Sequence, residues 1–318
     1  MIIGHMNMPV PLSGIARLEC FACIRVSGVD AGAFLQAQLT SDFSSLNHDR
    51  ARLAGFCSAK GRLQASFVGW KHGETEVVLL CSADLLAATL KRLSMFVLRM
   101  KCRLTDASRE MTVFGLAGSS VNGPLEQSSV WELREGAAGT AIRLPDANGQ
   151  ALAIWLPRPT ENQPLPADPE LSQEEWRWLQ VSSGIPFVEA KTVDLFVPQM
   201  INFELLGGVD FQKGCYPGQE VVARSQYRGS LRRRMFLFDC DVHASPGHEV
   251  FGSDDPDQPA GVIVNAAAHP RGSGSSMLVE VKLGELKRGS LHLGTPAGPT
   301  LVQRDLPYTV PLPAGQTA

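Results

Sequence analysis

A thiol and an ammonium group stand two residues apart in residues 213–220, which read Lys-Gly-Cys-Tyr-Pro-Gly-Gln-Glu. Pro217 suits the first position of a helix, and no helix breaker follows Gly218 before Arg224, so the pattern predicts a turn and then a helix. Cys215 would then lie just outside the helix N-terminus. The partial positive charge there, together with the Lys213 ammonium if it turns the same way, would favour the thiolate. Cys215 is therefore a candidate functional thiol, with Lys213 beside it.

The same spacing also fits a purely structural role, in which Cys215 is a small residue in a tight turn and Lys213 is solvated. The chain has seven cysteines, an odd number scattered through apolar surroundings, which suits reduced thiols better than a disulfide framework. Cys20 and Cys23 have the C-x-x-C spacing, but they fall on a predicted strand, where residues three apart point to opposite faces. Neither the cysteines nor the dispersed histidines predict a metal site or a permanently bound iron–sulfur cluster.

Composition narrows the class of protein. The chain has 318 residues, of which 44% are hydrophobic and 19% charged, as in ordinary globular domains, and this length allows two or three domains. A net charge of −3 argues against a surface that binds nucleic acid everywhere, although a local basic patch remains open. Neither a long apolar run nor a signal-peptide pattern is present, so we expect a cytoplasmic protein without a membrane partner.

Alternation of strands and helices with short links predicts an α+β domain in the first third of the chain. The expected elements are strands at 18–26, 63–70 and 76–81, a helix capped by Asp30, and a longer helix over 82–100 capped by Ser82. Apolar runs at 111–116, 130–133 and 151–156 predict a second sheet, and the prolines of 157–169 predict a surface linker.

Local patterns also predict the elements in the rest of the chain. Ser172 and Glu175 form a capping-box pattern at the start of a helix that Gly184 and Pro186 end. After residue 234, short strand patterns at 235–239, 261–265, 277–283 and 300–302 alternate with glycine and proline turns, which predicts a small β-barrel. We therefore expect an N-terminal α+β domain (1–105), a second α+β domain that carries residues 213–220 (106–230), and a C-terminal β-barrel (231–318).

The region around Cys215 resembles a known family over a long stretch. Residues 198–204, the Gly207-Gly208 pair and residues 213–224 are similar to the signature of the YgfZ family of folate-binding proteins, relatives of the glycine-cleavage aminomethyltransferase. Residues 34–42 and 56–62 also resemble this family, with Ala37 where it usually has glycine. The resemblance covers most of the chain outside roughly 118–170, and implies an aminomethyltransferase-like multi-domain fold.

The resemblance also implies a cofactor and partners. The cofactor would be tetrahydrofolate or a derivative. The function would be to support the assembly, repair or maintenance of iron–sulfur enzymes, including tRNA-thiolating ones. The protein partners would then be iron–sulfur proteins, among them radical-type tRNA-modifying enzymes, with Cys215 central to the role.

A folate pocket would lie where the parts meet. Trp176 and Phe21 match aromatic positions of the family's folate site, and aromatic faces suit a flat pterin, although Trp176 is equally explained as a hydrophobic staple. The other expected folate contacts are Gln199, Asn202, Tyr216, Gln219, Glu220, Arg224 and Arg228. Guanidinium groups here suit the carboxylates of a glutamate tail or the phosphates of RNA, and a solvated basic turn is the alternative. Direct nucleic-acid binding is left open.

The acidic residues that the resemblance to the glycine-cleavage aminomethyltransferases would lead us to expect are missing. Those enzymes carry acidic residues on the strand that follows the glycine turn, where this chain has Ala65 and Ser66. Neither side chain ionises near neutral pH, so aminomethyltransferase activity is not expected. Two alternatives to the iron–sulfur role stay open: a tetrahydrofolate-dependent one-carbon transferase that uses other residues, and a non-catalytic scaffold.

Overall fold

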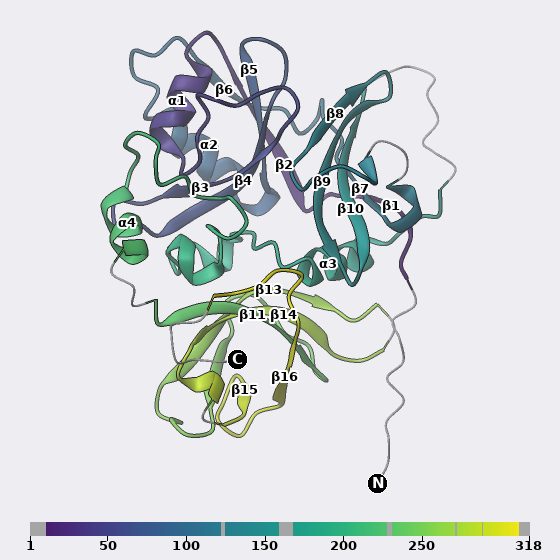
Figure 1. Cartoon of the computed structure of the whole chain (residues 1–318), viewed down its shortest axis with the longest axis vertical. Helices are drawn as coiled ribbons and strands as arrows, with labels where there is room; N and C mark the ends of the chain where they lie inside the picture. Colours follow the sequence, from purple (N-terminus) through teal and green to yellow (C-terminus); the bar gives the residue numbers. More distant parts are fainter. Residues whose placement is uncertain are drawn as a thin grey trace.

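The computed structural model describes residues 11–121, 125–158, 168–227, 231–270, 272–287 and 289–311. Two five-stranded sheets and one closed six-stranded barrel organise them. In Figure 1 the two sheets stand side by side above the barrel, and helix α3 (Gln173–Ser182) lies between the second sheet and the barrel. The expected α+β class with a C-terminal barrel is confirmed. In the ranges described, no helix is long and apolar enough to cross a bilayer.

The first sheet is antiparallel, with the strand order β3-β4-β5-β2-β6. Its strands are β2 (Phe21–Ser27), β3 (Arg52–Cys57), β4 (Leu63–Lys71), β5 (Glu76–Ser82) and β6 (Arg103–Asp106). Two helices cover it, α1 (Ala31–Gln38) and α2 (Leu86–Ser94), the second preceded by the 3-10 turn η1 (Ala83–Leu85). Phe34 and Leu35 of α1 and Leu93 of α2 are fully buried in the core beneath them.

The helix predicted over 82–100 is shorter than expected. It ends at Ser94, and Ser82 makes no side-chain cap hydrogen bond. Leu98 adopts a left-handed conformation with φ 47°, which an α-helix cannot contain, and the chain turns there into β6. Asp30 also makes no side-chain cap bond, because its carboxylate accepts a hydrogen bond from the Lys101 N–H at 2.6 Å instead.

The second sheet has the order β1-β7-β10-β9-β8. Its strands are β1 (Gly14–Arg17), β7 (Phe114–Ala117), β8 (Leu133–Gly136), β9 (Gly139–Ala147) and β10 (Gln150–Pro157), with the 3-10 turn η2 (Gly118–Ser120) after β7. Strand β1 precedes the first sheet in sequence but pairs with β7, so a cut at residue 105 would separate it from its own sheet. Strand β9 was not predicted, because Arg143 and Pro145 interrupt its apolar run. The proline cluster lies mostly outside the described residues.

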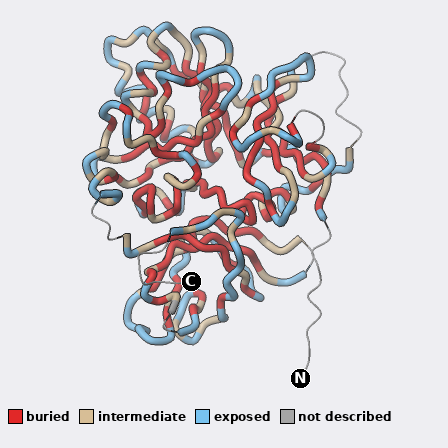
Figure 2. Tube along the Cα trace, in the orientation of Figure 1, coloured by how far each residue is buried: buried red, intermediate tan, exposed pale blue. Residues whose placement is uncertain are grey.

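The barrel closes in the order β11-β14-β13-β12-β15-β16, with β16 paired back to β11. Its strands are β11 (Arg233–Cys240), β12 (Glu249–Gly252), β13 (Pro259–Ala268), β14 (Ser275–Lys282), β15 (Leu291–Leu293) and β16 (Thr300–Arg304), with the 3-10 turn η6 (Glu285–Lys287) before β15. Side chains alternate along β11: Phe236 and Phe238 fill the barrel, whereas Met235 and Leu237 join the core shared with the two sheets. Figure 2 shows this buried band where the barrel meets the sheets.

Helix α3 fixes the second sheet on the barrel. The predicted capping box is confirmed: the Ser172 side chain accepts from the Glu175 N–H, and Glu175 accepts from the Ser172 N–H in return. Trp176 follows in the next turn and is only 1% exposed. Its ring lies over Gly115 of β7, where a Cβ atom would come within 2.4 Å of the indole. The absence of a side chain at Gly115 therefore makes room for Trp176.

We expect Gly115→Ala to lower the free energy of unfolding by about 1–3 kcal/mol, because the indole ring is held in the core and cannot move aside cheaply. The matched control is Gly136→Ala in β8, where a new Cβ would meet nothing within 4 Å and which should change stability by less than about 0.5 kcal/mol. Urea unfolding of the two variants and the wild type measures both changes in the free energy of unfolding. Equal stability of the two variants would contradict the packing described for Trp176.

Candidate functional site

The region around Cys215 is a series of bends followed by a short helix. Helix α4 (Gln219–Tyr227) begins two residues after Pro217, so the prediction that Pro217 occupies its first position is wrong. Gly218 has φ +79°, and a Cβ there would lie 2.3 Å from the carbonyl oxygen of Ser58. On the facing turn between β3 and β4, Gly61 has φ +70° and would collide with Val221 in the same way. Two glycines thus seat this region against the β3–β4 turn.

The Lys213 ammonium is hydrogen-bonded to the C-terminal end of helix α1. Its Nζ donates to the carbonyl oxygens of Gln36, at 2.6 Å, and of Leu39, which are the free carbonyls at the C-terminal end of that helix. The same Nζ lies 5.0 Å from the centre of the Tyr216 ring. In the described part of the chain it makes no hydrogen bond to Cys215, so the expected pairing of ammonium and thiol is not what the structure shows. Lys213 instead fastens the Cys215 turn to the first domain.

Burial sets the charge state of the residues around Lys213. Desolvation lowers the pKa of Lys213 from 10.5 to about 8, although the carboxylates of Asp42 and Asp210 oppose that shift. Burial also raises the pKa of the Tyr216 phenol, so this residue is neutral at physiological pH. Lys213 therefore carries its positive charge at neutral pH at a cost in folding free energy.

Cys215 is the one exposed cysteine among the seven, all of which the structure describes. Burial raises the pKa of Cys23, Cys57 and Cys81 to about 12, so these thiols are held in the unreactive protonated form. Cys20 and Cys102 are half-buried, and desolvation raises their pKa as well. Access to solvent therefore singles out Cys215 as the available nucleophile, whereas its thiolate character stays a prediction.

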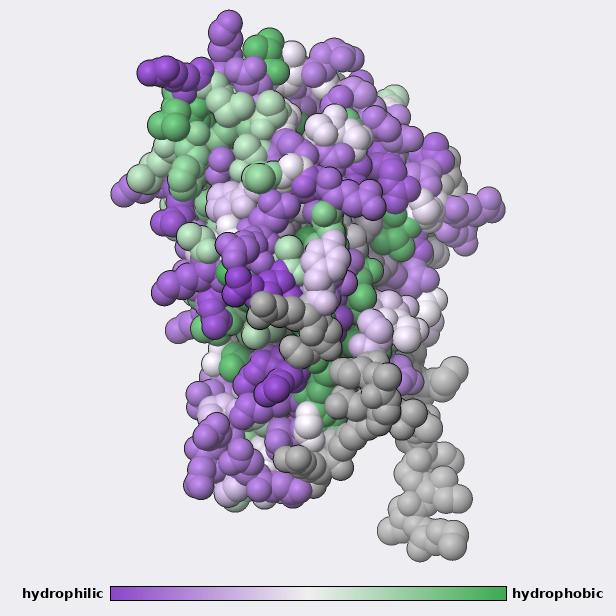
Figure 3. Space-filling model, turned by 60° about the vertical axis from the view of Figure 1, so that its left-hand side comes forward, coloured by the Kyte–Doolittle hydropathy of each residue, from purple (hydrophilic) through white to green (hydrophobic). Residues whose placement is uncertain are grey.

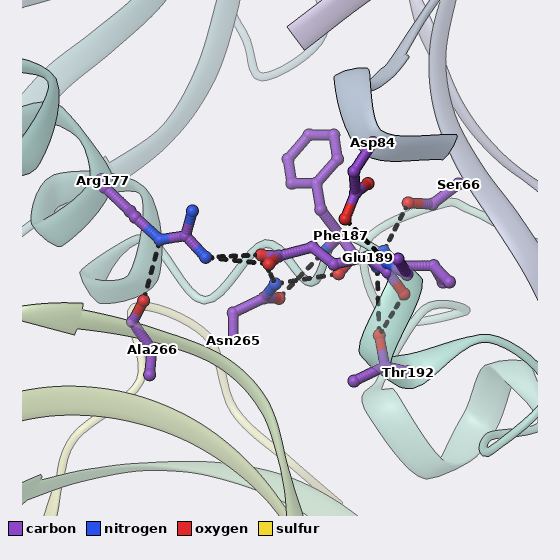
Figure 4. Close-up of polar contacts among 10 residues, drawn as sticks. Ser66, Asp84, Arg177, Phe187, Glu189, Thr192, Asn265 and Ala266 are labelled. Carbon is purple, nitrogen blue, oxygen red and sulfur yellow. Dashed lines mark hydrogen bonds and ion pairs between the residues drawn. The ribbon is translucent and has the colours of Figure 1, made fainter. Parts of the chain in front are cut away.

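A second constellation lies where the two sheets and the barrel meet (Figure 4). The Glu189 carboxylate accepts hydrogen bonds from the Arg177 guanidinium of α3, at 2.8 and 2.9 Å, and from Asn265 Nδ2 of β13, at 2.7 Å. Arg177 also donates through Nε to the Ala266 carbonyl at 2.9 Å. Asn265 exchanges two further hydrogen bonds with the Phe187 backbone, both of 2.9 Å. One carboxylate thus connects α3, β13 and the segment that follows α3.

The first domain holds this segment from its other side. The Val188 N–H donates to Ser66 Oγ of β4, and the Ala190 N–H donates to the Asp84 carboxylate, both at 2.9 Å. The segment then continues into the 3-10 turn η4 (Ala190–Thr192). Residues 187–190 are therefore fixed by side chains from all three parts of the fold, which we call the junction segment.

The residues expected to contact folate fall into separate places. Phe21 packs edge-on against Phe187 of the junction segment, with ring centres 4.8 Å apart. Trp176 is buried in the core and offers no exposed face for stacking. Gln199, in the 3-10 turn η5 (Pro198–Ile201), is fully buried and donates to the Val222 carbonyl at 2.8 Å. Asn202 is also fully buried and donates to the Met235 carbonyl at 2.7 Å. As the structure stands, these last three residues support the fold.

The remaining expected contacts lie beside Cys215, apart from Arg228, which falls outside the described residues. Tyr216 is buried, and Gln219 Nε2 donates to the Lys213 carbonyl at 3.5 Å. Glu220 and Arg224 form an ion pair one turn apart on the exposed side of α4. The structure thus brings Phe21 to the junction, buries Tyr216 beside Lys213, and leaves Glu220 and Arg224 at the surface of the helix that follows the thiol.

The junction residues Arg177, Glu189 and Asn265 were not predicted. A signal for two of them exists, because Glu189 follows the apolar run 185–188 and Asn265 sits within the apolar strand β13. A polar residue in such a run is buried only where it finds partners. That they lie together could be seen only in the folded structure, since residues 177 and 265 are far apart in sequence. Within the described ranges, no group of three His, Cys, Asp or Glu side chains is placed to hold a metal ion.

We expect the stability advantage of the wild type over Lys213→Met to rise between pH 8 and 10.5. The unfolded chain, with a lysine pKa of 10.5, binds more protons in this window than the folded chain, in which the pKa is about 8. The cost of burying the charge is therefore fully present below pH 8 and is relieved above it; with a discount for solvent screening of this partly solvated ammonium, the relief is about 2 kcal/mol. Urea unfolding across this range measures the difference, with the exposed Lys60→Met as the control for removing a lysine. If the difference in unfolding free energy between the wild type and Lys213→Met fell with pH, the lowered pKa of Lys213 would be contradicted.

Comparison with known proteins agrees with this architecture. Residues 12–135 match the family model of the GCVT N-terminal domain. The aminomethyltransferase T of the glycine cleavage system from Bartonella henselae has a similar structure, with a TM-score of 0.70 and 13% identity over 93% of this chain and 86% of its own. At that identity the likeness shows the fold alone, and the fold is that of the GcvT-like aminomethyltransferases.

Two curated relatives are each described as tRNA-modifying protein YgfZ. The protein from Colwellia psychrerythraea is 26% identical over 95% of both chains. The protein from Edwardsiella ictaluri is 32% identical over 71% of this chain and 71% of its own. Identity at that level over most of both sequences, together with the shared fold, shows that the chain belongs to the YgfZ family of tRNA-modifying proteins.

Proposed function

We propose that this protein binds a reduced folate at the junction segment and supports the assembly, repair or maintenance of iron–sulfur enzymes that include tRNA-thiolating ones. Membership of a tRNA-modifying family supports the link to tRNA, and a fold shared with the glycine-cleavage aminomethyltransferase supports the folate. The observation that carries the proposal is the Glu189 carboxylate, held by Arg177 and Asn265 where the three parts of the fold meet. Sites between domains are where small-molecule ligands most often bind.

The junction has the donor and acceptor groups that a pterin needs. A carboxylate such as Glu189 can accept hydrogen bonds from the amino and ring N–H groups of a pterin, and its side chain is 17% exposed, so it is not sealed in the core. Phe21 and Phe187 provide aromatic surface beside it. The Arg177 guanidinium fixes the orientation of the carboxylate. These residues would hold the pterin end of tetrahydrofolate, which supplies one-carbon chemistry when bound.

The same region argues against aminomethyl transfer. Ala65 and Ser66 are buried in β4, and the Ser66 hydroxyl already accepts the Val188 N–H, so these two positions present no acid or base to a bound substrate. A positioned acid or base contributes about 10²–10⁴-fold to a rate, and its absence leaves binding without turnover. The role proposed for folate is accordingly one of binding.

The exposed Cys215 provides a contact with client proteins. It lies at the surface, whereas the other thiols are buried or half-buried, so a macromolecule can reach it without unfolding the protein. Iron–sulfur proteins, including radical-type tRNA-modifying enzymes, are the partners that this proposal names. The turn that carries Cys215 is held to the first domain by Lys213, which fixes where a client meets the thiol.

We expect Glu189→Gln to weaken binding of tetrahydrofolate by about tenfold or more, because a hydrogen bond to a charged group contributes about 1.5–3 kcal/mol. Isothermal calorimetry on the wild type and the variant measures this affinity. Glu74→Gln is the control, because Glu74 is 93% exposed at a remote turn. Unchanged affinity in a folded Glu189→Gln protein would remove the junction from the folate site.

In a deletion strain of the source organism, we expect Cys215→Ser to fail to restore tRNA thiolation, whereas the wild type and the half-buried Cys102→Ser should restore it. The reason is that a hydroxyl at this position keeps the size of the side chain but cannot act as a thiolate nucleophile or ligand. Mass spectrometry of thiolated nucleosides in total tRNA gives the readout. Full complementation by Cys215→Ser would favour the scaffold alternative, in which this region only shapes a surface.

The purified wild type should form methylenetetrahydrofolate from an aminomethylated lipoyl carrier at no more than the background rate, because Ala65 and Ser66 supply no ionised group. The assay follows the folate product, with a glycine-cleavage aminomethyltransferase as the positive control. Robust turnover would make the one-carbon transferase the preferred function.

A further inference from the structure

We infer that the outer side of α4 binds single-stranded RNA, with a base stacked on Tyr227 and the neighbouring phosphates on arginine. This inference rests on the proposed function, because it names the substrate class that a tRNA-modifying role would bring to the protein. Its centre is a pocket of about 400 Å³ between α4, η5 and the start of β11. The residues that line it are Val197, Met200, Arg224, Ser225, Leu231, Arg232 and Arg233.

The pocket has two kinds of lining. Val197, Met200 and Leu231 provide apolar surface that can cover the face of a base. Arginines provide the positive charge, which suits phosphate groups because guanidinium forks match their oxygens. Such a combination of apolar platform and cationic edge is what proteins use to follow a single strand without reading its sequence.

The three arginines differ in what they already bind. Arg233 donates to both carboxylate oxygens of the buried Glu280, at 2.8 and 2.9 Å, so it is held in place. Arg224 pairs with the exposed Glu220 on its own helix, a weak ion pair that a phosphate can replace. Arg232 is exposed, and its guanidinium makes no hydrogen bond or ion pair with another described residue; only its backbone carbonyl is bonded, by the Leu283 N–H at 2.8 Å. Arg232 is therefore the cation most available to a phosphate.

An exposed tyrosine, packed against the half-buried Phe211, extends this site. Tyr227 is 73% exposed, and its ring lies edge-on to Phe211, with ring centres 6.3 Å apart. Because Tyr227 follows Arg224 by three residues on α4, both side chains lie on one side of the helix, and Arg224 lines the pocket. A tyrosine with most of its side chain in solvent suits a stacked base better than a core role.

The location favours RNA over the glutamate tail of folate. Figure 3 is turned so that the side of the molecule bearing α4 comes forward; hydrophilic residues dominate its lower part, whereas hydrophobic surface gathers at the upper end. The site is an open pocket on the helix that follows Cys215, and not an enclosed cavity. An RNA strand lying along it would pass close to the exposed thiol. The net charge of −3 belongs to the whole chain and does not prevent a local cationic patch.

Binding of a fluorescein-labelled decauridine to the full-length protein tests the inference by fluorescence anisotropy at 50 and 200 mM salt. We expect the wild type to bind and to lose affinity as salt rises. Tyr227→Ala should bind about tenfold more weakly through loss of stacking. Arg232→Ala should lower the slope of log affinity against log salt by about 0.7, the loss of one phosphate contact. Leu98→Ala, which removes another exposed apolar side chain, and Arg99→Ala, at an exposed arginine elsewhere, should bind like the wild type.

The outcomes separate this inference from the folate proposal. Thermal unfolding first establishes that each variant is folded, and calorimetry with a mono- and a pentaglutamylated tetrahydrofolate is run on the same proteins. No binding of decauridine by the wild type, or equal binding by all variants, overturns the RNA site even where folate still binds. A loss of pentaglutamylated folate affinity in Arg232→Ala, with RNA binding unchanged, assigns the arginines to the folate tail instead. Loss of RNA binding in Tyr227→Ala and Arg232→Ala with folate affinity intact supports the inference.

Discussion

The structure depends on the way the junction segment is held. Glu189 is a partly buried carboxylate, and leaving such a charge without partners would be costly, so Arg177 and Asn265 must be in place for the segment to adopt this path. Because those partners come from α3 and from the barrel, and Ser66 comes from the first sheet, one short segment couples all three parts. A ligand bound here would contact Glu189, and the junction segment that carries Glu189 is held by all three parts. Its binding would therefore depend on how the three parts are arranged.

Much of the architecture could be predicted because it follows local rules. The capping box at Ser172 and the strands β2, β4 and β5 depend on neighbouring residues, and the structure has them close to where the local patterns predicted them. The failures have local causes too. The second helix ends at Ser94, and the left-handed backbone of Leu98 prevents it from continuing toward residue 100. Strand β9 was missed because it contains the polar Arg143, whose guanidinium is buried and donates to the Leu152 carbonyl at 3.0 Å.

The candidate site was harder to predict, because its geometry comes from contacts between distant residues. The sequence pattern identified Cys215 and its turn, but not that Lys213 binds carbonyl groups at the end of α1, some 174 residues away in the chain. Gln199 and Asn202 are polar residues within a recognisable signature, and nothing in their spacing distinguishes a ligand contact from the backbone hydrogen bonds that they make. Arg177, Glu189 and Asn265 become a group only when β13 is packed beside α3.

The anchoring of the Cys215 turn limits where the thiol can go. Lys213 is tied to α1 and Gly218 is seated on the β3–β4 turn, so the thiol lies on a tether of about five residues fixed at both ends. Even fully extended, that length of chain spans only about 17 Å, and a bent tether gives the sulfur much less travel. Cys215 therefore keeps its place on this exposed turn and does not act as a mobile arm. A molecule that reacts with this thiol must approach it from the solvent, where Cys215 is exposed.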